Sequence, residues 1–257
     1  MIYQEWKTPP ELKFIIDCIW TYESKKGESQ SLFIIPDGCI DLVIEGGRKI
    51  KTFWVGAMFE RTLVHIEEDQ ILFGIRFKPG SAYAIFPFPM NELSGKTIPS
   101  EDLNFDDSFF LEHLFSLNCL SDQVNRIYDW VLHKTVNFKT NSIVRGFMTT
   151  IEKSFEPMKI SQIAEVLGIS RQYLGRVFCH YTGLDPKTFY RIYRIQKALN
   201  LISLEPKKDI NWVEAAVSFG FYDQSHFIHE FNRLIGTCPL KYEPSLVSIS
   251  TIHSFSN

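Results

Sequence analysis

One short pattern occurs twice in the C-terminal part of this chain, and it limits the possible folds more than any other feature. The stretches VLGISRQYLGRVFCHYTG (166–183) and SFGFYDQSHFIHEFNRLIG (218–236) share one layout. Each has a glycine in a short apolar turn, a polar residue able to cap a helix, an amphipathic run with Phe, and a closing glycine. The closing glycines, Gly183 and Gly236, are 53 positions apart. The pattern predicts two copies of one small helical unit.

Each copy predicts two helices joined by a tight turn. In the second copy, Asp223 can accept hydrogen bonds from the free amides of a helix that begins at Gln224. The preceding helix ends at Gly220, where glycine tolerates a left-handed conformation. Ser170 takes the capping role in the first copy. Because a helix pair joined by a short turn with Gly is typical of DNA-binding helix-turn-helix units, the second helix of each copy could enter a major groove.

The two faces of each second helix differ in polarity, so one is expected to be buried and the other exposed. Leu174 and Phe178 face inward in the first copy, and Phe227 and Phe231 do so in the second. The outward residues suit DNA, because Arg can bond guanine, Gln can bond adenine, and helix N-termini attract phosphates. The predicted DNA-binding residues are Ser170, Arg171, Gln172, Arg176, His180, Gln224, Ser225, His229, Asn232 and Arg233.

The helices before these second helices present small apolar residues to them. Val213, Ala216 and Val217 are expected to form the inner face in the second copy. A long helix from about Lys187 to Ser203 is expected to bridge the copies and to hold the outward helices about 34 Å apart, near one DNA turn. One helix hairpin with a polar face is commonly just a solvated surface. Two copies in one orientation favour DNA binding.

The C-terminal part from about residue 142 to 243 resembles the AraC/XylS family of bacterial transcription regulators. The motifs that carry the resemblance are IAEVLGISRQYLGRVFCHYTGLDPKTFYRIYRIQKALNLI and VEAAVSFGFYDQSHFIHEFNRLIGTCPLKY. It implies two helix-turn-helix units that bind double-stranded DNA in adjacent major-groove segments and activate transcription through RNA polymerase. The chain departs from the family at His229, where Arg is frequent, and at Gly175 within a helix. The first unit is therefore expected to do most base recognition.

The front half predicts short strands, with β-rich runs ended by glycine or charge, as in KTFWV, RTLVHI and QILFGIRF. This spacing suggests a small cupin-like β-barrel, and Pro36-Asp37-Gly38 predicts a hairpin-like turn. Amphipathic helices are expected within 107–134. The expected fold is therefore α+β and multidomain. Its parts are a β-rich sensor or dimerisation domain (1–134), a linker (135–141), an all-α domain with two helix-turn-helix units (142–243) and a polar tail (244–257).

The stretches PDGCIDLVI and GIRFKPGSAYAIF resemble a small-barrel sensor domain of some AraC/XylS members. This resemblance implies a small-molecule effector or a homodimer, the latter through the helices at 107–134. Trp54 and Arg76 are the candidate effector contacts. The alternatives are a ligand-independent regulator controlled by abundance or by a protein partner, and a small-molecule-binding protein or enzyme with a helical interaction module.

The balance of charged residues differs between the same two parts of the chain that the motifs distinguish. Residues 1–141 carry 14 Lys and Arg against 20 Asp and Glu, whereas residues 142–257 carry 13 against 10. The basic second half fits a DNA partner. The five scattered cysteines and the isolated His65 predict no metal site, cofactor or catalytic centre. Without a long apolar run or a signal-peptide layout, the sequence indicates a cytoplasmic protein with no membrane partner.

Overall fold

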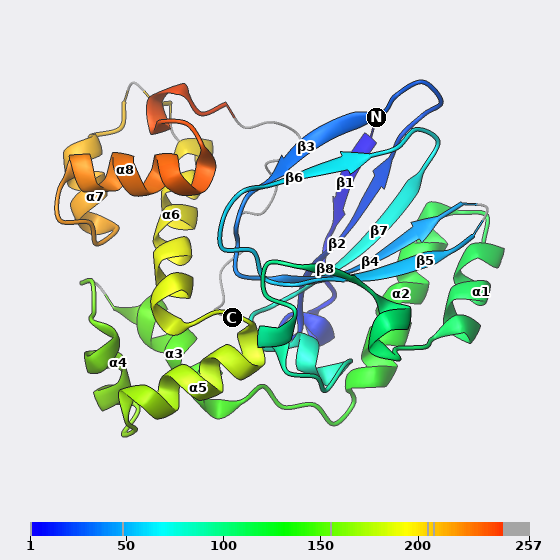
Figure 1. Ribbon diagram of the computed structural model, residues 1–257, viewed down its shortest axis with the longest axis horizontal. Coiled ribbons are helices and arrows are strands. Elements are labelled where there is room, and N and C mark those ends of the chain that lie inside the picture. Colours follow the sequence, from blue (N-terminus) through cyan, green and yellow to red (C-terminus); the bar gives the residue numbers. More distant parts are fainter. Residues whose placement is uncertain (1, 48, 155, 205, 208, 244–257) are drawn as a thin grey trace.

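The computed structural model describes residues 2–47, 49–154, 156–204, 206–207 and 209–243. A β-rich N-terminal region lies beside a helical C-terminal region (Figure 1). The predicted mixed architecture is confirmed at this level. The predicted polar tail, 244–257, lies outside the described residues. No helix in the described ranges has both the length and the apolar character needed to cross a membrane.

The strands of the N-terminal region form two sheets. The strands are β1 (Ile2–Trp6), β2 (Ile16–Glu23), β3 (Gln30–Ile34), β4 (Ile40–Gly46), β5 (Lys51–Val55), β6 (Thr62–Ile66), β7 (Ile71–Phe77) and β8 (Thr97–Pro99). One sheet has the order β1-β2-β7-β4-β5-β8, and β3 pairs with β6 in a separate sheet. Among the described strands, hydrogen bonding does not close the two sheets into one continuous barrel.

The turn at 36–38 does not form the hairpin that the sequence predicted. β3 before the turn pairs with β6, whereas β4 after it pairs with β5 and β7. The turn therefore carries the chain from one sheet to the other. Gly38 has a φ of 79°, and any side chain there would collide with the ring of Phe189 in the helical region.

The side-chain alternation of β4 and β7 separates the two faces of the larger sheet. Leu42 and Phe73 point to a buried core, where Phe73 packs edge-on against Phe115 at 5.9 Å. Asp41 and Arg76 point to the opposite face, which the β3–β6 sheet covers. The larger sheet therefore has a packed face and a face that borders a cavity.

The helices agree closely with the amphipathic segments of the sequence. They are α1 (Ser108–Ser116), α2 (Leu120–Thr135), α3 (Ser142–Lys153), α4 (Ile160–Val166), α5 (Arg171–Thr182), α6 (Pro186–Leu204), α7 (Trp212–Ser218) and α8 (Gln224–Ile235). Short 3₁₀ turns occur at Pro10–Leu12, Ala82–Ala84, Met90–Glu92, Ser100–Leu103 and Pro239–Lys241. Since α2 includes Thr135, the connection to α3 begins one residue later than expected. Asn141 caps α3 by accepting a hydrogen bond from the Ile143 amide at 2.9 Å.

Candidate nucleic-acid interface

Helices α4 and α5 (the first helix pair) and helices α7 and α8 (the second helix pair) repeat one geometry. In each pair a glycine with positive φ lies in the turn, Gly168 at 67° and Gly220 at 87°. Another ends the second helix, Gly183 at 83° and Gly236 at 84°. These four positions are in the left-handed region, where glycine avoids the strain of a Cβ atom. The repeat seen in the sequence is therefore a repeat of backbone conformation.

The N-terminal caps of α5 and α8 are those that the sequence predicted. Ser170 accepts a hydrogen bond from the Tyr173 amide at 3.1 Å. Asp223 accepts one from the His226 amide at 2.7 Å. Each cap satisfies one of the amides left free at a helix start. The remaining amides of the first turn stay open to solvent or to an anion.

The predicted inner faces of α5 and α8 are confirmed, whereas the inner face predicted for α7 is partly wrong. Leu174 and Phe178 of α5, like Phe227 and Phe231 of α8, are fully buried. In α7, Ala216 is buried as expected, but Val213 and Val217 are 57% and 55% exposed. The ring of Trp212 stacks on Phe227 at 5.9 Å and fills the place expected for the valines. The small side chains of Ala215 and Ala216 then face the interior beside it.

Helix α6 bridges the two pairs, as the sequence predicted. It has 19 residues, about 28 Å at 1.5 Å per residue. Figure 1 shows α5 and α8 at its two ends, running in the same sense, so that their N-terminal ends lie on the same side of the molecule. An ion pair of 3.4 Å between Arg191 of α6 and Glu230 of α8 joins the bridge to the second pair.

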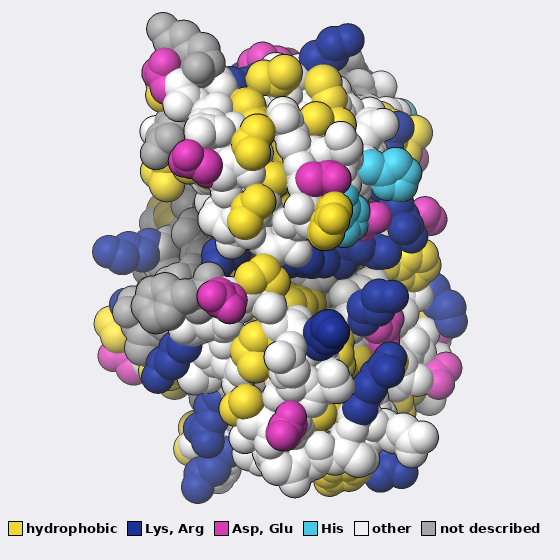
Figure 2. Space-filling view, turned by 90° about the vertical axis from the view of Figure 1, so that its left-hand side faces the viewer, with side chains coloured by type: hydrophobic (Ala, Val, Ile, Leu, Met, Phe, Trp, Pro, Cys, Tyr) yellow, Lys and Arg dark blue, Asp and Glu magenta, His cyan; other side chains and the backbone are white. Residues whose placement is uncertain are grey.

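Most of the predicted DNA-binding residues are exposed. The exposed ones are Ser170, Arg171, Gln172, Arg176, Ser225, His229, Asn232 and Arg233. Gln224 is half-buried at the start of α8. Figure 2 views this side and shows Lys and Arg side chains around its middle, between the second pair above and the first pair below. The two predicted sets thus come from two different helices, α5 and α8, whose N-terminal ends lie on the same side of the molecule.

His180 departs from the expected outward orientation. It is half-buried, with its ring 5.5 Å from that of Tyr83 in the β-rich region. The neighbouring Tyr181 also packs on Tyr83, at 4.7 Å. The C-terminal end of α5 therefore belongs to the junction between regions, and a single helix cannot reveal that from its own sequence.

The two outward helices differ in how their cations are paired. The Arg176 guanidinium lies 5.3 Å from the ring of Tyr173, which sequence reasoning overlooked. No described carboxylate forms an ion pair with Arg171 or Arg176. In α8, by contrast, Glu230 lies 3.8 Å from Arg233. The first helix pair therefore presents more uncompensated positive charge.

The Tyr173 ring could have been found from spacing, because a tyrosine three residues before an arginine shares its helix face. It is 41% exposed and lies on the outward side of α5. Its ring limits the orientations of the guanidinium by a cation–π contact. Tyr173 therefore belongs with Arg176 in the candidate interface.

The junction between the regions is built from specific contacts. Gln196 of α6 donates a hydrogen bond of 2.7 Å to the carbonyl of Pro36, in the turn between the sheets. Ser94 donates to the carbonyl of Gly183 at the end of α5. Buried side chains of both regions form one continuous hydrophobic cluster. The helical region is thus positioned by direct contact as well as by the connecting chain.

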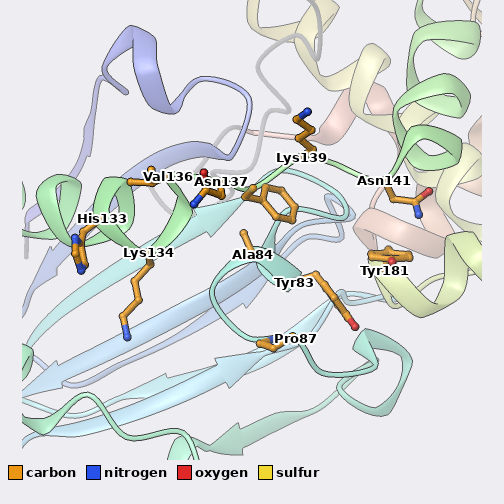
Figure 3. Close-up of a pocket in the computed structure, with 11 residues that line it drawn as sticks. Tyr83, Ala84, Pro87, His133, Lys134, Val136, Asn137, Lys139, Asn141 and Tyr181 are labelled. Atoms are coloured by element: carbon orange, nitrogen blue, oxygen red, sulfur yellow. The ribbon is translucent and has the colours of Figure 1, made fainter.

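A cleft of about 460 Å³ lies where the connection between α2 and α3 passes over this junction. Tyr83 and Tyr181 lie at one end of it and His133 at the other (Figure 3). Figure 3 also shows Lys134 and Lys139 pointing in opposite directions. These cations do not converge on a common point, and Lys134 already pairs with Asp107 at 3.1 Å.

The two candidate effector contacts lie in different surroundings. Arg76 lines a cavity of about 320 Å³ between the two sheets. Trp54 is not among the lining residues. It is fully buried in the core, stacked on Phe77 at 5.9 Å and on Phe86 at 5.3 Å. The described residues include no cluster of three or more His, Cys, Asp or Glu side chains that could hold a metal ion.

Comparison with known proteins matches the two regions separately. Residues 4–99 match a domain of unknown function (DUF6597), and residues 163–244 match a helix-turn-helix domain. The chain is 27% identical over 137 residues to the HTH-type transcriptional regulator GlxA of Rhizobium meliloti, covering 46% of this chain and 40% of GlxA. It is 28% identical over 102 residues to the probable transcription factor PqrA of Proteus vulgaris, covering 40% of this chain and 80% of PqrA.

A solved structure matches the same C-terminal part. It is the C-terminal domain of AraT, a response regulator from Geobacillus stearothermophilus, with 26% identity and a TM-score of 0.36. The match covers 40% of this chain and 84% of that one. The helix-turn-helix region of this chain is therefore similar to the corresponding regions of known bacterial transcription regulators.

Proposed function

We propose that this protein is a sequence-specific DNA-binding transcription regulator. In this proposal the two helix pairs are helix-turn-helix units that place α5 and α8 in adjacent major-groove segments of one duplex. The observation that carries it is the placement of α5 and α8 at the two ends of α6, with their N-terminal ends on one side. A regulator of this kind would act in the bacterial cytoplasm.

The exposed polar residues of α5 have distinct roles in the proposal. Arg171, at the tip of the helix, contacts phosphate together with the free amides of the first turn. Gln172 and Arg176 reach base edges, where Arg favours guanine and Gln favours adenine. In α8, Ser225, His229 and Asn232 make corresponding but weaker contacts, because Glu230 lowers the local positive charge.

The β-rich region serves as a sensor in this proposal. Residues 1–134 form a small barrel-like unit whose two sheets enclose the cavity beside Arg76, residues 135–141 link it to the helical unit, and residues 142–243 bind DNA. A small-molecule effector in the cavity would alter the contacts with α6 and thereby activate transcription through RNA polymerase. Helices α1 and α2 would pair two copies of the chain, since Phe109 on α1 is 81% exposed.

The direct test is selection of bound sequences from random duplexes by the full chain. The expected result is one motif with two conserved elements, separated by about one helical turn. Affinity for that motif should fall steeply with salt, because phosphate contacts release counterions. A pool without enrichment, or an affinity that does not change with salt, would exclude the proposed groove-bound mode. A protein with only one DNA-binding helix pair would select one element.

A further inference from the structure

The cavity between the two sheets has a mainly apolar wall. Leu32 and Val64 line it from the β3–β6 sheet, and Val43, Phe53 and Leu72 line it from the larger sheet. Its volume of about 320 Å³ lies at the lower end of the range for small-molecule sites, roughly 300–1,000 Å³. An occupant of this size carries only a few polar groups, so the charges at the cavity wall decide its chemistry.

One end of the cavity holds a single guanidinium among several carboxylates. Arg76 Nε lies 3.3 Å from Asp37 Oδ2, and its Nη2 lies 3.4 Å from Asp41 Oδ2. Its Nη1 lies 3.9 Å from Glu5 Oε1. Arg76 is 7% exposed. One buried positive charge is thus shared by three negative charges, and the cluster keeps an excess of negative charge.

Among the described residues, no Lys or Arg other than Arg76 lines the cavity, and the ring of His65 is hydrogen-bonded to Ser31 at 3.2 Å. Glu45 also borders the cavity, but Lys51 pairs with it at 3.2 Å. Burial, together with the charge of Asp41, raises the pKa of Asp37 to about 6 even though Arg76 lowers it. A buried carboxylate with a raised pKa is stabilised in its ionised form by an additional cation.

Since this region is a sensor in the function proposed above, we propose that the cavity binds a small organic cation, with an ammonium group at Asp37 and Asp41 and an apolar body against the wall. An anionic ligand fits poorly, because Arg76 is already engaged by carboxylates. Such a ligand would have to displace one of them and still face the others. A neutral apolar ligand would leave the excess negative charge as it is.

The aromatic side chains beside the carboxylates support the same ligand class. Trp20 donates a hydrogen bond of 2.9 Å from its indole nitrogen to Asp41 and stacks on Tyr3 with 6.3 Å between ring centroids. Any side chain at Gly74 would overlap the indole of Trp20, so this glycine leaves room for the ring at the cavity wall. Aromatic faces attract ammonium groups, most strongly where water is excluded.

A second polar group faces the same end. The Cys39 thiol lines the cavity and is more than nine-tenths buried, and in the described part of the chain it makes no hydrogen bond. Burial beside Asp37 raises its pKa well above the ordinary value, so the thiol is neutral. It offers a ligand a weak, uncharged partner next to the carboxylates.

The test compares ligands that differ only in their head group. Isothermal titration calorimetry of the full chain would use octylammonium, octan-1-ol and octanoate at pH 7.5. We expect octylammonium to bind at least tenfold more tightly than the other two. Equal affinities, tighter binding of octanoate, or no binding of any of the three would overturn the proposal.

Matched variants then locate the head group. Asp37→Asn should abolish the preference for octylammonium, whereas Glu45→Gln, in the same cavity but paired with Lys51, should keep it. If Asp37→Asn fails to fold, Asp41→Asn serves in its place, and the comparison of head groups on the unaltered chain still decides. Binding of the selected DNA is measured on the same samples. A chain that binds this DNA but does not prefer octylammonium would contradict the ligand inference and leave the proposed DNA-binding function intact.

Discussion

Replacing Arg176 by alanine tests the proposed DNA contact most directly. The side chain is exposed on α5, it stacks on Tyr173 at 5.3 Å, and in the described part of the chain no carboxylate pairs with it. Its charge is therefore available to DNA without breaking an internal ion pair. If the guanidinium grips guanine with two hydrogen bonds, its loss should cost about 1–3 kcal/mol, or roughly 5- to 150-fold in affinity.

Two further variants separate base recognition from charge. Arg176→Lys keeps the charge but loses the planar donor pair, so it should retain affinity for random DNA while losing preference for the selected motif. Arg233→Ala should cost less than Arg176→Ala, because Glu230 lies 3.8 Å from Arg233 and already offsets its charge. Lys26→Ala, in the exposed loop between β2 and β3, is the control and should change neither quantity.

The assay is fluorescence anisotropy with the selected duplex and a scrambled duplex, each titrated at several salt concentrations. A base contact lowers affinity for the selected duplex alone, whereas a phosphate contact weakens both duplexes and reduces the salt slope by about one. Arg176→Ala with unaltered affinity for both duplexes would refute the placement of α5 in a groove. A cost equal to that of Arg233→Ala would refute the argument from charge pairing.

The remaining predictions concern stability. Gly175→Ala should raise the free energy of unfolding by about 0.5–1 kcal/mol, measured by urea titration, because no described atom lies within 4 Å of an added Cβ atom. Ser170→Ala should lower it by about 1 kcal/mol through loss of the cap, and Ser170→Asp, which can still cap, should not. Because the pKa of Asp37 is raised from 3.8 to about 6 in the folded chain, this group's contribution to stability is greatest below pH 4 and declines as pH rises through 6. Asp37→Asn should therefore gain stability relative to the unaltered chain between pH 4 and pH 7, and a constant difference would contradict the raised pKa.

The features that the sequence predicted well are those encoded within a few residues. The caps at Ser170 and Asp223 and the turns at Gly168 and Gly220 depend on local backbone geometry, so the helix pairs could be placed from sequence. The β-rich runs KTFWV, RTLVHI and QILFGIRF also correspond to strands, β5, β6 and β7. Which strands pair is a long-range property, and the turn at 36–38 was therefore mistaken for a hairpin.

The charges at the cavity wall are a clearer example of an arrangement that local sequence patterns do not reveal. Arg76 could be named from the sequence as an effector contact, but its carboxylate partners lie far from it in the sequence, at Glu5 in β1 and at Asp37 and Asp41 around the start of β4. Only the folded sheet brings them together. Trp54 looked equally suitable in sequence, yet strand alternation turns it to the packed face, since neighbouring residues of a strand point to opposite sides.

The turn at residues 36–38 also determines how freely this protein could be recombined with its relatives. Asp37 faces the cavity, while Pro36 and Gly38 on either side touch Gln196 and Phe189 of α6. A chimera that joins this β-rich region to the helical region of another regulator would keep ligand contacts but lose the matching surface on α6. Exchange of sensors between such proteins should therefore succeed only when the two α6 positions are transplanted together with the turn.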